Sequence, residues 1–274
     1  MEKIKSWIKS AAGIVSICLL TVSIFLLVLA CSSWGNLTER AANNVNNILF
    51  GLGTNLIGII VTVSFVQFFL DRQNANTERK HEREKILRFD RIMQIHIRHY
   101  IMYFNTITTP MDQRKTVSTT DLKHEFSFSD MKDLYFQSLF LRNKSYEPAI
   151  VAFYDVELEL RKYCAEFSSQ VDFKYYQNLL SILTQFVEVS LAFDVRSAVL
   201  GNSSLTLGDK KLTNYIHELI EDSSHDWVSE IHSTNEGGNI IAPYVTLFDM
   251  LNLERELISQ YKTSISSLKS DINN

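Results

Sequence analysis

Two long stretches without a charged residue constrain this chain more than any other feature. Residues 10–38 and 41–70 contain no Asp, Glu, Lys or Arg. The hydrocarbon core of a bilayer is about 30 Å thick, and a helix crosses it with roughly 20 apolar residues. The segments 11–31 and 48–70 reach that length, whereas a core helix of a soluble protein rarely lacks charge on every face. We therefore predict an N-terminal hairpin of two transmembrane helices within residues 1–70.

The distribution of Lys and Arg predicts how this hairpin is oriented. Cytoplasmic segments next to a membrane span are enriched in these residues. Lys3, Lys5 and Lys9 precede the first span, and the connection 32–47 carries only Arg40. A basic collar follows the second span and consists of Arg72, Arg79, Lys80, Arg83, Lys85 and Arg88. We expect a multi-pass protein of the cell inner (plasma) membrane with both termini in the cytoplasm.

Processing at Cys31 is an alternative for the first span. The residues Val28-Leu29-Ala30-Cys31 loosely resemble a bacterial lipoprotein cleavage box. Cleavage there would leave Cys31 as a lipidated N-terminus. The apolar run of roughly 20 residues is longer than the 7–15 residues typical of a signal peptide, which favours a retained span.

The remainder of the chain predicts an all-α protein. Residues 71–106 continue the second span as a charged stalk helix, and residues 107–274 form a cytoplasmic helical bundle domain. Apolar residues recur every three or four positions in the stalk helix, as expected for one buried face: Ile86, Phe89, Met93, Ile97, Tyr100 and Phe104. Further helices are expected at about 129–142, 147–168, 173–200 and 209–233, and from Pro243 onwards.

Charge is distributed unevenly over the cytoplasmic part. Residues 71–100 hold eight Lys and Arg against five Asp and Glu, and residues 101–274 hold 15 against 24. A basic segment next to the bilayer suits anionic headgroups. Because binding to nucleic acid depends on neutralising phosphates, the acidic domain argues against direct nucleic-acid binding.

The second span carries a face of small residues. Thr54, Gly58 and Thr62 recur every four residues, and Gly51 lies one heptad before Gly58. Such faces let helices approach closely in lipid, where packing drives association. The face receives either the first span of the same chain or a helix of another copy.

Two amides accompany this face. Asn55 and Gln67 lie within or at the edge of the second span, where an amide needs a partner or water. Each is a candidate for an interhelical hydrogen bond or for a pore lining. Because the spans contain no Asp, Glu, Lys, Arg or His, a proton relay is not expected.

No catalytic or metal-binding motif emerges, so we expect neither an enzyme nor a cofactor. His96 with His99 and Glu221 with His225 share helical spacing, but a metal site needs more than a pair. The acids of 155–162 superficially resemble a nuclease motif, yet this stretch predicts a helix in which Glu157 and Arg161 form an ordinary ion pair.

The layout resembles that of small bacterial two-transmembrane effectors of anti-phage defence operons, including retron-linked and cyclic-nucleotide-linked ones. The resemblance rests on the paired spans, the second span GLGTNLIGIIVTVSFVQ, the stalk ERKHEREK and the helical domain. It implies a toxin effector that a cytoplasmic protein or ribonucleoprotein partner holds inactive. On release, its spans would self-associate and disrupt the membrane. The alternatives are a non-toxic sensor or adaptor that uses the hairpin only as an anchor, and a membrane-bound enzyme with an unfamiliar site.

Overall fold

The computed structural model describes residues 11–32, 38–138, 147–234 and 238–270. Most of them, 79%, lie in helices, and the only strands among them are β1 (Thr206–Leu207) and β2 (Lys210–Lys211), which pair antiparallel. The predicted all-α class is therefore confirmed. The chain divides into two compact units, Met1–Arg79 and Lys80–Asn274, and helix α3 (Glu39–Ile107) contributes residues to both.

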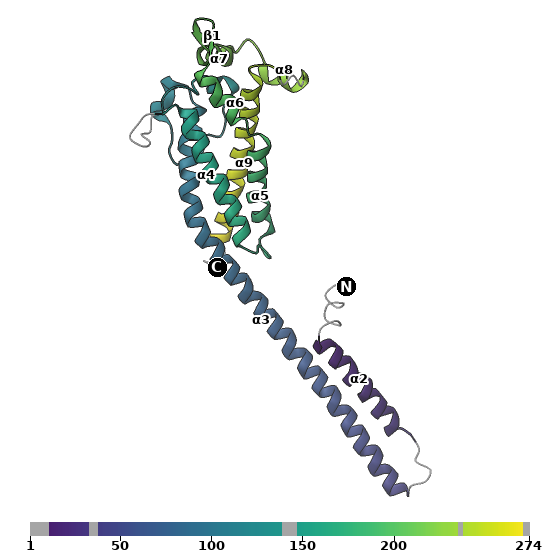
Figure 1. Ribbon diagram of the computed structural model, residues 1–274. Coiled ribbons are helices and arrows are strands. Elements are labelled where there is room, and N and C mark those ends of the chain that lie inside the picture. Colours follow the sequence, from purple (N-terminus) through teal and green to yellow (C-terminus); the bar gives the residue numbers. More distant parts are fainter. Residues whose placement is uncertain (1–10, 33–37, 139–146, 235–237, 271–274) are drawn as a thin grey trace. The chain divides into compact units, whose positions relative to one another are not determined.

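In the first unit, helix α2 (Ala11–Ala30) lies beside the N-terminal half of α3 (Figure 1). The buried side chains of α2 are small: Ser16, Ser23 and Ala30, at intervals of seven residues. Opposite them, Gly53 is the one buried position among residues 39–79 of α3. Small residues on both helices allow the close approach that favours helix pairing in an apolar solvent.

Among the described residues, α3 is the one continuous helix that is long and apolar enough to cross a membrane. Only 6% of its apolar window is buried, whereas the core helix of a soluble domain is mostly buried. The described apolar part of α2, Ile14–Ala30, falls short of the length required. The prediction of two transmembrane helices is therefore confirmed only in part, because the described residues contain one helix of sufficient length.

The second unit is built around four helices that lie lengthwise beside one another (Figure 1): the C-terminal part of α3, α4 (Ala149–Gln170), α5 (Gln177–Ala192) and α9 (Ala242–Ser270). The apolar face predicted for the stalk helix is confirmed, because five of its six residues are at most 3% exposed and Phe89 is half-buried. The predicted helices at 147–168 and from Pro243 correspond to α4 and α9.

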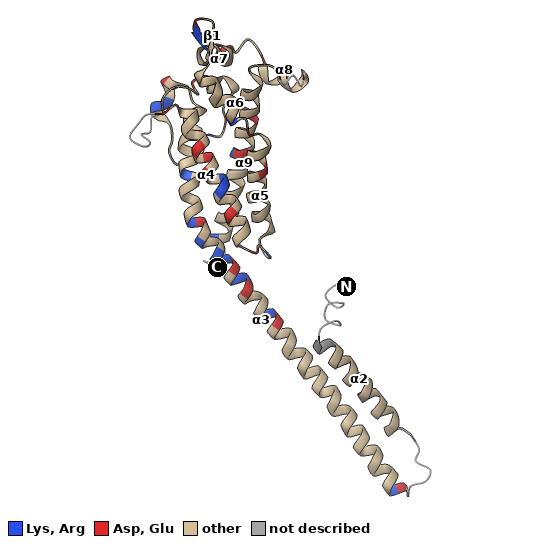
Figure 2. Cartoon of the chain, viewed as in Figure 1, with Lys and Arg blue, Asp and Glu red and all other residues tan. Residues whose placement is uncertain are grey.

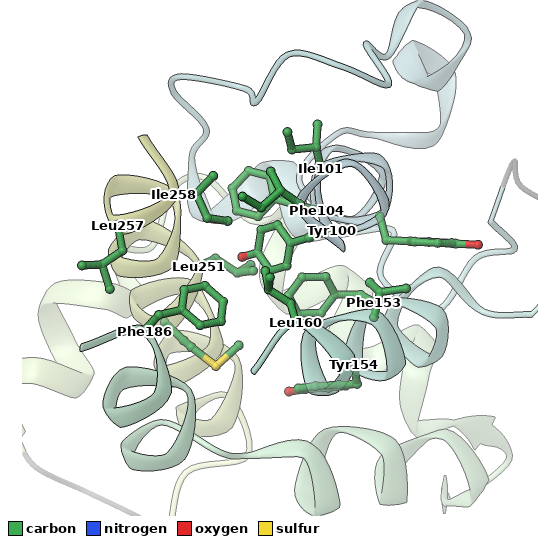
Figure 3. Packing of buried hydrophobic residues seen from close by; sticks show 14 of the residues in the cluster. Tyr100, Ile101, Phe104, Phe153, Tyr154, Leu160, Phe186, Leu251, Leu257 and Ile258 are labelled. Atoms are coloured by element: carbon green, nitrogen blue, oxygen red, sulfur yellow. The ribbon is translucent and has the colours of Figure 1, made fainter. Parts of the chain in front are cut away.

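Aromatic rings fill the centre of this bundle (Figure 3). The ring of Tyr100 from α3 lies 5.5 Å from that of Phe153 on α4 and 6.2 Å from that of Phe186 on α5. Leu251 and Ile258 of α9 complete the cluster. Burial of such large side chains contributes about 1.5–3 kcal/mol each, which makes these rings a main source of the unit's stability.

The helix predicted at 129–142 is wrong in its described part. Ser127 and Asp130 form a capping box, but only the short 3₁₀ helix η2 (Phe128–Met131) follows, and then turns. The buried Arg114, in the 3₁₀ helix η1 (Met111–Thr116), donates to the carbonyl oxygens of Asp133 and Gln137 at 2.7 and 3.3 Å. These carbonyls therefore serve a distant side chain rather than a helix. Residues 139–142 lie outside the described residues.

The helix predicted at 173–200 is broken. Phe173 is fully buried with a φ of 45°, so α5 begins only at Gln177. A second break separates α5 from α6 (Arg196–Gly201), where Asp194 reaches Arg161 at 3.6 Å. The 3₁₀ helix η3 (Asn202–Ser204) follows α6. Tertiary contacts outweigh helix propensity at both breaks.

The helix predicted at 209–233 is also divided, into α7 (Leu212–Glu221) and α8 (Trp227–Thr234). Between them, Asp222 and Asp226 accept hydrogen bonds from the backbone N–H groups of Ser224 and Ser229. Aspartate competes with the helix for backbone donors in this way. The tight turn before α7 places Gly208 at a φ of +61°, which favours glycine.

Candidate functional site

The predicted association face lies on the exposed side of α3. Thr54, Gly58 and Thr62 are all exposed, and a Cβ atom added to Gly58 would meet nothing within 4 Å. The hydroxyls of Thr54 and Thr62 donate to backbone carbonyls one turn earlier, each at 2.9 Å. Gly51 is half-buried, and its Cβ position is also open. The face therefore presents a shallow surface whose hydroxyl protons are already engaged within the helix.

Helix α2 packs against a different side of α3. The hydroxyl of Ser23 donates to the carbonyl oxygen of Gly53 at 2.7 Å, and this bond is buried. A Cβ atom on Gly53 would lie 2.8 Å from Cγ of Leu27. Within the described residues, Thr54, Gly58 and Thr62 are thus not the residues that receive α2. Sequence reasoning missed Ser23 and Gly53, although small residues seven apart in a Leu- and Ile-rich segment were a usable signal.

The two amides differ in their surroundings. Asn55 is exposed next to Thr54, and no hydrogen bond of its side chain occurs among the described residues. Gln67 is half-buried, and its Oε1 has no partner there. The neighbouring exposed side chains are large and apolar, such as Phe65 at 63% exposure. In hydrocarbon, an unpaired amide would cost several kcal/mol.

The basic collar is mostly exposed. Arg72, Arg79, Lys80, Lys85 and Arg88 are exposed on α3, whereas Arg83 is half-buried. Nε and Nη2 of Arg83 lack a partner among the described residues, and Lys85 donates to the carbonyl oxygen of Gln170. The collar residues from Lys80 onwards belong to the second unit.

The interior of the second unit holds a carboxyl group that no cation contacts directly. Glu254 of α9 is completely buried and accepts a hydrogen bond from the hydroxyl of Tyr100 at 2.6 Å. Burial, and then the charge of Glu157, raise the pKa of Glu254 well above its ordinary value. Its other oxygen has no partner among the described residues. The protonated form is therefore favoured.

Glu157 of α4 is buried nearby but is better satisfied. Ser190 donates to one of its oxygens, and Arg196 lies 3.3 Å from the other. Burial raises the pKa of this carboxyl, while Ser190 and the two nearby arginines oppose that shift. The predicted helix at 155–162 is confirmed, and the ion pairs observed here join Arg196 to Glu157 and Arg161 to Asp194.

A third buried acid ties α9 to α3. Asp90 is 1% exposed and accepts hydrogen bonds from Gln94, Tyr261 and Lys269 at 2.8, 2.9 and 2.7 Å. Both of its oxygens accept hydrogen bonds from donors of this chain. Its arrangement is that of a structural clamp.

The histidine pairs are used for local contacts. His96 stacks on Tyr163, and burial lowers the pKa of His96. Glu221 is bound by Lys132 at 2.6 Å, whereas His225 pairs with Glu230. In the described ranges, no group of three or more His, Cys, Asp or Glu side chains is placed to hold a metal ion. Burial also raises the pKa of the Cys164 thiol, which disfavours a reactive thiolate.

No protein-family model, no curated protein and no solved structure matches this chain. Among the described residues, the face of α3 around Gly58 is exposed and packs against no other helix.

Proposed function

We propose that α2 and the apolar half of α3 both cross the inner membrane, with the two termini in the cytoplasm. The support is the exposure of large apolar side chains on both helices, such as Phe25 at 62% and Phe68 at 62%. These surfaces are unfavourable in water and favourable in lipid. The cytoplasmic placement of the ends is supported by three lysines before α2 and by the basic collar.

We further propose that the chain is a membrane effector that acts by self-association of its spans. One observation carries this proposal: the exposed face around Gly58 lies beside an unpaired amide on a helix otherwise covered by apolar side chains. A second copy of α3 would bury the small face and supply a partner for Asn55. Assembly of several copies would then permeabilise or depolarise the membrane.

The physiological role proposed is anti-phage defence, in line with the resemblance of the layout to retron-linked effectors. In this scheme a cytoplasmic protein or ribonucleoprotein holds the second unit and keeps the spans apart. Infection would disturb that partner and release the effector. The acidic character of the second unit supports a protein contact rather than direct binding to nucleic acid.

The experiment is controlled induction of the full chain in bacteria, with dye influx and membrane potential as readouts. Gly58→Leu fills the open surface, and Asn55→Leu removes the amide; both should abolish permeabilisation at equal membrane abundance. Val63→Leu is the matched control, because Val63 is also exposed but lies roughly 140° around the helix from Gly58. Permeabilisation that persists in both test variants would contradict the proposed face.

A second candidate function is a non-toxic sensor or adaptor. It is favoured by the separate core of Lys80–Asn274, which packs without the apolar helices. This candidate predicts harmless induction of the wild type. It also predicts that a foreign two-span anchor can replace residues 1–70 without loss of function.

A further inference from the structure

The outer face of α3 in the second unit combines basic and apolar side chains. Arg88, Arg91, Ile92, Ile95, Arg98 and His99 are all exposed there. At 100° per residue they fall within an arc of about 120° on the helix. We call this surface the Arg–Ile face. Its two isoleucines are 49% and 55% exposed and lie three residues apart, between the arginines.

The isoleucines of this face are not part of the core of this copy. The opposite side of the same helical segment is packed into the bundle through Ile86, Met93 and Ile97, all at most 3% exposed. The helix therefore has two apolar sides, of which only one is covered by residues that the structure describes. The uncovered side is available for a contact outside the chain.

The arginines of the Arg–Ile face also make no polar contact through their side chains among the described residues. No ion pair or hydrogen bond among the described residues involves the side chains of Arg88, Arg91 or Arg98. Glu84, one turn before Arg88, pairs with His81 instead, and Asp90 is buried on the inner side. Lys and Arg can be followed as blue bands along α3 in Figure 2. This basic surface belongs to a unit that holds 21 Lys and Arg against 27 Asp and Glu.

We propose that the Arg–Ile face is the docking site for a partner protein that presents an acidic amphipathic helix. Carboxylates of the partner would pair with the three arginines, and its apolar ridge would cover the two isoleucines. Arginine suits this role because its planar guanidinium binds a carboxylate through two hydrogen bonds. Arginine is also enriched in protein interfaces, where lysine is depleted.

Other occupants fit this surface less well. In a symmetric contact with a second copy, the arginines of the two copies would face and repel each other. A nucleic acid would leave the isoleucines uncovered, and the face has no Phe, Tyr or Trp on which bases stack. A membrane-binding helix needs a broad apolar side, whereas the exposed side of this helix offers two isoleucines.

This inference rests on the proposed function for its biological role, since it names where a silencing partner would hold the second unit. Its test measures binding alone. The full chain in zwitterionic nanodiscs is titrated with a fluorescent synthetic helix that carries Leu at i and i+3 between Glu residues. A second helix, with Lys in place of Glu, is the charge control. Anisotropy should show salt-sensitive binding of the acidic helix only.

Two triple variants locate the site. Arg88→Glu, Arg91→Glu and Arg98→Glu together should weaken binding about tenfold or more, because each reversal replaces an attraction by a repulsion. The matched control reverses Lys115, Lys162 and Lys211, which are exposed and form no ion pair among the described residues. It carries the same change in net charge and should bind as the wild type does. Ile92→Ser with Ile95→Ser should also weaken binding.

Several results would overturn the inference. If both triple variants lost affinity for the acidic helix equally, the binding would reflect unspecific attraction to net charge. If the basic helix bound as tightly as the acidic helix, recognition by charge would be excluded. Binding of an oligonucleotide or of phosphatidylglycerol vesicles that only the arginine variant loses would assign the face to those ligands. A change of oligomeric state in the arginine variant would assign it to a second copy. None of these readouts depends on permeabilisation, so a harmless wild type would refute the proposed function without affecting this test.

Discussion

Ser23 and Gly53 join the two apolar helices through one buried hydrogen bond of 2.7 Å, from the serine hydroxyl to the glycine carbonyl oxygen. The contact uses a glycine of α3, at which an added Cβ atom would lie 2.8 Å from Leu27 of α2. It also separates two roles along α3, because Gly53 serves packing within the chain while Gly58 faces outwards. Substitutions at these two glycines should therefore have different consequences.

Gly53→Val should weaken the pairing of α2 with α3. A Cβ atom there lies 2.8 Å from Cγ of Leu27 and 3.3 Å from the carbonyl oxygen of Ser23, so the Leu27 side chain must move and the two backbones must separate slightly. Overpacking of this kind costs about 1–3 kcal/mol. Disulfide crosslinking between cysteines introduced into the two helices of the full chain measures the loss.

Leu27→Ala is the compensating change, since it removes the side chain that the new methyl groups meet. The double variant should regain much of the crosslinking that Gly53→Val loses. Gly58→Val should leave crosslinking within the chain unchanged. A similar loss for both glycine variants would show that the packing geometry described for α2 is wrong.

Glu254→Gln should make the fold more stable at neutral pH. Burial raises the pKa of Glu254, so the folded chain keeps a proton that the unfolded chain releases above about pH 4.5. The stability linked to this proton is fully present below that pH and declines as the pH rises towards the folded pKa. The decline has a limiting slope of about 1.4 kcal/mol per pH unit. Glutamine does not titrate and lacks this decline.

Thermal unfolding of the detergent-solubilised full chain between pH 5 and 8 provides the measurement. The melting temperature of Glu254→Gln should exceed that of the wild type by a margin that widens with pH. Glu256→Gln is the control, because this residue lies two positions away on α9 but is exposed. If the melting temperatures of Glu254→Gln and the wild type changed in parallel with pH, the Glu254 carboxyl would already be ionised in the folded chain.

Asp90→Ala should cost more stability than Lys269→Ala. Removing Asp90 leaves the buried hydroxyl of Tyr261 without its acceptor, a loss of about 2–4 kcal/mol with the packing change. The side chain of Lys269 is 52% exposed, so its ion pair is screened and contributes about 0.5–1 kcal/mol. Hydrogen exchange of the last turns of α9 should rise strongly in the first variant and slightly in the second. A larger rise in Lys269→Ala than in Asp90→Ala would show that Asp90 is not the main link between α9 and α3.

Cys31 should react with a membrane-impermeant maleimide added to intact cells. It is exposed immediately after α2, and the proposed topology places it on the outer side of the membrane. Cys18 would lie within hydrocarbon, and Cys164 is buried in the second unit, so Cys31→Ser should abolish labelling. Labelling only after cell lysis would reverse the topology. Absence of labelling together with incorporation of palmitate would identify Cys31 as a lipoprotein cleavage site.

Much of the helical framework was predictable from local patterns. The stripe from Ile86 to Phe104 predicted the buried side of α3, and Pro148 and Pro243 marked the beginnings of α4 and α9. These signals are local because helical periodicity and proline geometry act within a few residues. The breaks near Phe173 and Asp194 were missed, since apolar periodicity reveals neither the φ of 45° at Phe173 nor the hydrogen bond from the backbone N–H of Arg196 to Asp194. The contact of Asp194 with Arg161 is distant in the sequence.

The candidate site was also predictable only in those features that depend on local sequence. The sequence by itself determined that α3 is apolar enough for a membrane, and that it carries small residues at Gly51, Thr54, Gly58 and Thr62 beside Asn55. Only the tertiary structure decided that α2 packs on Gly53 and that the face around Gly58 stays uncovered. Spacing defines the faces of a helix, but the side that a neighbour covers depends on side-chain volumes in both helices. Here the small side chain of Ser23 and the missing side chain of Gly53 allow α2 to pack on the Gly53 side of α3.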